Sequence, residues 1–240
     1  MRQEGKETWA PFKSLPGPEF RPIYTDDRGI YRISGLPAGK YLVQVNLDLT
    51  LQITYMSHSS TSTSSSGGHY DILTIYSGST PRLKDAAGFS LDLGEERPGE
   101  DLRIPISKLH TIHGNIVSAH DGHVVNGGQV TLRYADDKSL AAAANSSAED
   151  PGFTLNFVYE GDYTLASPMS ADVDYELLPD PHGAVAPPQY TSHPRHLYGS
   201  ASMSLHVDGD MDGVTLAVPE PTAKEAQTYK NLLQQQEQRN

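Results

Sequence analysis

The segment with the clearest potential for chemistry is the acidic run DGDMDG that begins at Asp208. Asp208, Asp210 and Asp212 have the alternate spacing of a calcium loop, in which carboxylates converge on one hard cation and glycine allows a sharp bend. The twelfth position of such a loop requires a bidentate glutamate, but Pro219 occupies it here and Glu220 comes one residue later. The run therefore predicts either a calcium site or an acidic hairpin turn, and calcium is the only cofactor that we consider.

Histidines form a second group of candidate metal ligands, in three H-x-x-H pairs. The pairs are His110/His113, His120/His123 and His193/His196. Residues i and i+3 of a strand point to opposite faces, so the first pair, in a predicted strand, cannot chelate one ion locally. The other two pairs lie in predicted loops and lack the glutamate of a metalloprotease helix. We expect these histidines to lie at the surface without a metal.

Nucleophilic catalysis has no residue set behind it. The closest match to a G-x-S-x-G elbow is the segment 88–92, which ends in Asp92 instead of glycine. The chain has no cysteine, which excludes thiol nucleophiles, disulfides and zinc-thiolate sites. We therefore expect a protein that is not an enzyme.

Exposed aromatic rings are the candidates for ligand binding, because a sugar can stack on them. Those considered are Tyr70, Tyr76, Tyr190, Tyr198 and Trp9. The alternative is that these rings pack in strands or in the core, as tyrosine commonly does.

The stretch TDDRGIYRISGLPAGKYLVQV, residues 25–45, shows which elements position these groups. Alternating β-branched and aromatic residues predict strands over Ile30–Ile33 and Lys40–Val45. Pro37 and Gly39 between them favour a turn. A second stretch, AEDPGFTLNFVYEGDYTL at residues 148–165, repeats the acidic turn, the strand and the Gly-x-Tyr unit with the same spacing. The repeat indicates two copies of one supersecondary unit.

The first stretch resembles the signature of bacterial carboxypeptidase regulatory-like domains, which are similar to transthyretin-like accessory domains and collagen-adhesin B-type repeats. The resemblance covers residues 20–47 and, less closely, 108–168. It implies a β-sandwich of seven or eight strands, in a superfamily that includes carbohydrate-binding-like domains. Because sandwiches support many activities, the resemblance says more about fold than about function.

Further strands are predicted over segments 46–56, 70–76, 89–93, 102–106, 111–117, 129–134, 153–157, 163–167, 202–207 and 213–218. The Ala-rich segment 140–145 predicts a short helix or a loop, and the Pro-rich segment 168–200 predicts irregular structure. Thr222 and Glu225 fit a capping box ahead of the apolar stripe Ala226, Tyr229, Leu232 and Leu233. We expect a C-terminal helix there.

The composition narrows the class of partner. The 240 residues carry a net charge of −12, which argues against binding to nucleic acid or anionic membranes. No apolar run approaches the roughly 20 residues that span a bilayer, and the first residues lack the apolar core of a signal peptide. Only 28 residues precede Gly29, against about forty between Ile112 and Gly152, so we expect the first copy to be truncated and the chain to be a fragment.

The sequence thus predicts an all-β protein of tandem transthyretin-like sandwich units with a C-terminal helix. The expected parts are a truncated unit over residues 1–107 with a Ser/Thr-rich loop at 57–68, a second unit over 108–219, and a polar helix over 220–240. We expect a non-enzymatic module that binds a ligand such as carbohydrate, or acts as a spacer, in a larger periplasmic or cell-surface protein. The alternative is an accessory domain of a carboxypeptidase or outer-membrane receptor, in contact with neighbouring domains.

Overall fold

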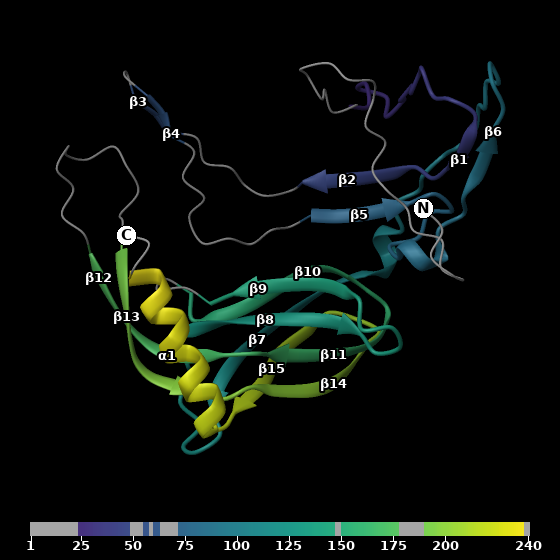
Figure 1. The fold of residues 1–240 in the computed structure, drawn as a ribbon. Helices are drawn as coiled ribbons and strands as arrows, with labels where there is room; N and C mark the ends of the chain where they lie inside the picture. The colour runs from purple at the N-terminus through teal and green to yellow at the C-terminus, as the bar shows by residue number, and fades with distance from the viewer. Residues whose placement is uncertain are drawn as a thin grey trace. The chain divides into compact units, whose positions relative to one another are not determined.

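The computed structural model describes residues 24–48, 55–57, 60–62, 72–146, 150–177 and 190–237. These residues form strands, two short 3-10 helices and one α-helix, α1 (Ala223–Glu237), near the C-terminus (Figure 1). The predicted all-β class with a C-terminal helix is confirmed. Within the described ranges, no helix has the length and apolar character to cross a membrane.

The chain divides into two compact units. The first comprises Met1–Val43 and Ala87–Glu100, and the second comprises Gln44–Ala86 and Asp101–Asn240. The expected boundaries after residues 107 and 219 stay predictions.

In the first unit, β1 (Gly39–Tyr41) and β6 (Phe89–Leu91) form an antiparallel ribbon. The predicted strand over Ile30–Ile33 is wrong, because these residues join no ladder among the described residues. The predicted strand over Lys40–Val45 is interrupted after Tyr41 and resumes at Gln44. Strand-forming side chains alone do not make a strand, since the backbone also needs a neighbour to pair with.

The second unit contains a two-sheet sandwich. One sheet has the order β10 (Gly152–Tyr159), β7 (Leu109–Ser118), β15 (Met211–Val218). The other has the order β13 (Tyr190–Tyr198), β12 (Ser170–Leu177), β8 (Gly127–Tyr134), β11 (Gly161–Ser167), β14 (Ala201–Val207), with β9 (Leu140–Asn145) also beside β8. Buried side chains from both sheets form one core.

Alternation along the strands builds this core. Val130 and Leu132 of β8 are buried while Gln129 and Arg133 are exposed. Because successive residues of a strand face opposite sides of the sheet, such a pattern buries one face and solvates the other. The strand predicted over residues 129–134 is thereby confirmed, with Val130 and Leu132 on its buried face.

Two ribbons precede the sandwich in the second unit. Strands β2 (Gln44–Asp48) and β5 (Ile72–Tyr76) pair with each other, as do β3 (Tyr55–Ser57) and β4 (Ser60–Ser62). Ser57 and β4 thus place part of the predicted Ser/Thr-rich loop in a hairpin, and residues 58–59 and 63–68 lie outside the described residues. Arg82, downstream of β5, donates hydrogen bonds to Asp136 at 2.6 Å and Asp137 at 2.8 Å in the β8–β9 turn.

The two sequence copies share local geometry. The carboxylates of Asp26 and Asp150 each accept a hydrogen bond from the backbone N–H two residues on, at 3.0 Å in both cases. The hydroxyls of Tyr41 and Tyr163 each donate to the carbonyl four residues upstream, at 2.6 Å in both cases. A tyrosine that bonds back to nearby backbone is a recurrent corner device of β-sandwiches. The predicted repeat is therefore real at the level of the turn and the tyrosine.

Three secondary-structure predictions in this unit are wrong. Segment 140–145 is strand β9 rather than helix or loop, because it pairs with β8 and buries Ala144. Segment 168–200 contains β12 and β13, which pair with each other. Segment 102–106 forms no strand and leads into a 3-10 helix over Ile106–Lys108.

Candidate functional site

The predicted tyrosine candidates lie in different surroundings. Tyr198 ends β13 and is only 4% exposed, so its ring is not a free stacking surface. Tyr76 ends β5 and is half-buried, and burial raises its pKa. Tyr190 begins β13, while Tyr70 and Trp9 lie outside the described residues.

The predicted calcium residues lie around one hairpin. Asp208 and Asp210 are in the turn between β14 and β15, and Asp212 is in β15. Asp210 accepts a hydrogen bond from the backbone N–H of Thr111 at 2.9 Å. In the part of the chain that the structure describes, no three or more histidine, aspartate or glutamate side chains are grouped to hold a metal ion.

The first histidine pair lies in a strand as predicted, whereas the loop predicted for His193 and His196 is wrong, because both lie in β13 and pair with β12. The first pair lies in β7. There His113 is exposed and His110 is half-buried, with Glu160 and Asp210 on either side at 3.8 and 3.7 Å. In the second pair, His123 belongs to a polar cluster, although we expected only a surface histidine at this position.

We call this group the His123 cluster, and it consists of Asp121, His123, Asp172 and Tyr198. Nδ1 of His123 lies 2.6 Å from the Asp121 carboxylate, and Nε2 lies 3.2 Å from that of Asp172. The Tyr198 hydroxyl donates to Asp172 at 2.9 Å and lies 3.1 Å from Nε2. Three separate segments are therefore joined: the β7–β8 connection, β12 and β13.

The electrostatics of the His123 cluster favour a charged imidazole. Hydrogen bonds to Asp121 and then Asp172 raise the pKa of His123. The same contact with His123 lowers the pKa of Asp121 to about 2. Burial, followed by the hydrogen bond to Asp172, raises the pKa of Tyr198 to about 12. A charged imidazole thus balances the negative charge of Asp172, which is only 8% exposed.

His196 lies against the Tyr198 ring. The two rings meet edge to face with centroids 4.8 Å apart, and Nε2 of His196 is 3.1 Å from the Glu220 carboxylate. These contacts tie the end of β13 to the segment that leads into α1. Tyr198 is therefore fixed by its hydroxyl and by its ring.

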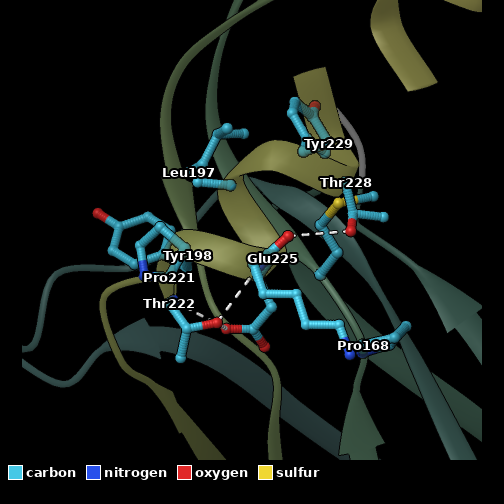
Figure 2. Close-up of a pocket in the computed structure, with 11 residues that line it drawn as sticks. Pro168, Leu197, Tyr198, Pro221, Thr222, Glu225, Thr228 and Tyr229 are labelled. Atoms are coloured by element: carbon cyan, nitrogen blue, oxygen red, sulfur yellow. Dashed lines mark hydrogen bonds between the residues drawn. The ribbon is translucent and has the colours of Figure 1, made fainter. Parts of the chain in front are cut away.

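A groove lies between α1 and the end of β13, and we call it the α1 groove. It encloses about 400 Å³ and is partly open to solvent. Its lining comes from residues 168–169, 197–198, 221–222, 224–226 and 228–229. Figure 2 shows Tyr229, Thr228 and Glu225 on the helix, and Leu197 and Tyr198 on the strand. The groove and the His123 cluster share Tyr198, whose hydroxyl belongs to the cluster.

The start of α1 is held by the predicted capping box. Glu225 N–H donates to the Thr222 hydroxyl at 3.3 Å, and the Glu225 carboxylate accepts from the Thr222 N–H at 2.8 Å (Figure 2). The second carboxylate oxygen accepts from the N–H and hydroxyl of Ser200, at 3.0 and 2.7 Å. The Thr222 hydroxyl also donates to the Glu225 carboxylate at 2.6 Å, and this bond first, followed by those from Ser200, lowers the pKa of Glu225 to about 2. One side chain therefore caps the helix and anchors it to the β13–β14 connection.

The groove combines apolar walls with a polar rim. Pro168, Leu197 and Tyr229 supply apolar surface, while Lys224 and Thr228 supply polar groups. Burial raises the pKa of Tyr229. Sequence reasoning assigned Tyr229 to the packing stripe of a helix and did not consider it as a ligand contact. The sequence signal was the tyrosine itself, because an aromatic ring in the apolar stripe of a helix can also line a groove beside that helix.

Comparisons with known proteins found few similarities. No family model matches the chain, and no curated protein is similar to it. Several solved structures align with parts of it, among them the following three. A "putative carbohydrate binding protein" from Pseudomonas aeruginosa is 12% identical, and the alignment covers 47% of this chain and 89% of that chain with a TM-score of 0.26. The pilus 2b backbone protein of group B streptococcus is 14% identical, with 63% of this chain and 50% of that chain covered and a TM-score of 0.28. A 9R-lipoxygenase from Cyanothece is 12% identical, with 51% of this chain and 19% of that chain covered and a TM-score of 0.26. At these TM-scores the alignments assign neither fold nor function to this chain.

Proposed function

We propose that this chain is a non-enzymatic β-sandwich module of a larger bacterial protein outside the cytoplasm, and that the α1 groove is its ligand site. The observation that carries the proposal is a groove whose two walls are fixed without a ligand. The Glu225 anchor holds the helical wall, and the His123 cluster holds Tyr198 on the strand. Fixed walls favour binding because little conformational freedom is lost when a ligand enters.

Carbohydrate is the ligand class that we propose. A sugar ring has apolar C–H faces and a periphery of hydroxyls. The Tyr229 ring and the neighbouring prolines suit the faces, and the Lys224 ammonium and Thr228 hydroxyl suit the hydroxyls. The resemblance of residues 25–45 to carboxypeptidase regulatory-like domains supports the same class, because their superfamily includes carbohydrate-binding-like folds.

A glycan array probed with the purified chain tests this proposal. We expect binding to one class of glycan, lost in Tyr229→Ala and kept in Tyr24→Ala, a matched control in which the truncated tyrosine is 80% exposed and lies in the other unit. Thermal unfolding of both variants checks that each is folded. The proposal fails if no glycan binds, or if both variants bind equally well.

A structural spacer or accessory domain is the second candidate. The first and last strands of the sandwich, β7 and β15, are neighbours in one sheet. The chain thus enters and leaves the sandwich on two adjacent strands, which suits a unit that is joined to further units before and after it. We propose tandem transthyretin-like units in a periplasmic or cell-surface protein, of which a carboxypeptidase or an outer-membrane receptor is one form. Fractionation of cells that express the native gene tests this location.

A further inference from the structure

The strands that begin and end the sandwich form a parallel ladder. Val214–Val218 of β15 pair in unbroken register with Gly114–Ser118 of β7, after an irregularity that follows the pair Met211/Ile112. The N–H of Ala119 donates to the carbonyl of Val218 at 2.9 Å and extends the contact by one residue. Among the described residues of the second unit, every other strand pair is antiparallel.

Parallel pairing places the two connections of the sandwich at opposite ends of this ladder. The chain enters β7 at Leu109, and it leaves β15 at Val218, beside the far end of β7. Tension between the preceding and following segments therefore acts along the two strands in opposite directions. Hydrogen bonds that cross between strands are then loaded together, whereas strands pulled apart from one shared end lose their bonds one after another.

The packing around the ladder adds to this resistance. Val214, Leu216 and Val218 are buried in the same core as Ile112 and Ile116 of β7. Sliding β15 along β7 would drag these side chains out of close-packed positions. Gly114 allows the backbones to approach, since a Cβ there would lie 2.2 Å from the carbonyl oxygen of Val214.

We infer that the sandwich bears tension, with the β7–β15 ladder as the element that must shear before the sandwich can be stretched out. This inference deepens the spacer candidate and does not depend on the α1 groove. It assigns a mechanical property to a specific pair of strands, and the property can be measured on the chain alone.

Pulling one folded protein along two directions tests the inference. Because the chain has no cysteine, pairs of introduced cysteines define the points of attachment. Lys108→Cys with Ala217→Cys grips the start of β7 and the end of β15, which loads the ladder in shear. His120→Cys with Ala217→Cys grips the same end of both strands, which peels the ladder open. All three positions are exposed.

We expect the mean unfolding force in single-molecule pulling to be several-fold higher in the shear direction than in the peel direction at the same loading rate. Thermal unfolding of both double variants should match that of the unsubstituted chain, so that a difference in force reports direction and not stability. Equal forces, or a higher force on peeling, would overturn the inference. A glycan array without any binder, by contrast, would remove the ligand proposal and leave a measured shear resistance standing.

Discussion

His123 is the residue whose contacts differ most from those that the sequence predicted. Both of its ring nitrogens face carboxylates, Asp121 on one side and Asp172 on the other. Asp172 is 49 residues away in the chain, so no local spacing pattern could reveal this partner. The H-x-x-H pattern pairs His123 with His120, its near neighbour in sequence, and says nothing about Asp172.

His123→Gln should change how stability depends on pH. The pKa of His123 is higher in the folded chain than the ordinary value of 6.5, because of Asp121 first and Asp172 second. A raised pKa means that the protonated ring stabilises the fold fully below pH 6.5 and loses this contribution as pH rises through the folded-state pKa. Melting temperatures should therefore differ most between variant and unsubstituted chain near about pH 5.5, and converge in alkaline buffer.

The matched control is His113→Gln, at an exposed histidine whose Nδ1 contacts the Thr154 hydroxyl at 3.0 Å. Its melting temperature should follow the unsubstituted chain across the same buffers. If His123→Gln and His113→Gln give parallel curves from about pH 5 to 8, the His123 cluster contributes no proton-linked stability.

At the scale of elements, the start of α1 could be predicted from sequence, but its position against the sandwich could not. The capping box at Thr222 and Glu225 is local, and the structure confirms it. The contact of Glu225 with Ser200 is not local, since 25 residues separate the two, and it turns a helix cap into an anchor. Sequence therefore predicted the start of the helix but not the groove that its position creates.

Thr222→Ala should loosen this end of the helix. Loss of an N-cap hydroxyl costs about 1 kcal/mol of stability, which urea unfolding followed by tyrosine fluorescence can resolve. Thr228→Ala is the control, because its hydroxyl bonds only within the helix, to the Lys224 carbonyl, and alanine is a good helix former. Equal unfolding midpoints for the two variants would show that the cap does not stabilise the unit.

Strand prediction succeeded where side chains alternate and failed where pairing decides. The alternating β8 and β15 were found with nearly correct bounds. The run of alanines in β9 favours helix locally, and only its register beside β8 makes it a strand. The Pro-rich composition of segment 168–200 suggested irregular structure. Pro194 nevertheless lies in β13, at a register shift of an edge strand, where a proline is tolerated.

Gly114→Ala tests the closest approach between β7 and β15. A Cβ at this position would lie 2.2 Å from the Val214 carbonyl oxygen and 2.5 Å from a Phe153 ring carbon, so a strand must shift. We expect a loss of about 1–3 kcal/mol in the free energy of unfolding, as for other overpacked sites. Gly209→Ala is the control, because nothing lies within 4 Å of its Cβ position. A variant at residue 114 as stable as the control would mean that the two strands approach less closely.

At the scale of the whole molecule, Arg82 joins parts of the second unit that are distant in sequence. Its guanidinium bonds to Asp136 and Asp137 and lies 4.0 Å over the Tyr134 ring. Its side chain is 19% exposed, so these contacts are partly shielded from water. Arg82 and Lys84 hold the pKa of Asp136 well below its usual range. The segment after β5 is thereby tied to the β8–β9 turn.

Arg82→Gln should release this segment without opening the sandwich. Because the pKa of Asp136 is lower in the folded chain, the ion pair stabilises the unit at neutral pH and weakens only as pH falls below about 4. At pH 7 we therefore expect faster hydrogen exchange in β5 and at residues 134–138, and unchanged exchange in β7 and β15.

Arg82→Lys should recover only part of the protection, since lysine keeps the charge but lacks the planar fork that bonds two carboxylates and stacks on Tyr134. Arg195→Gln, at an exposed arginine 3.6 Å from the Asp174 carboxylate and outside both β5 and residues 134–138, serves as control. Uniformly faster exchange in β7 and β15 would instead show that Arg82 supports the sandwich core itself.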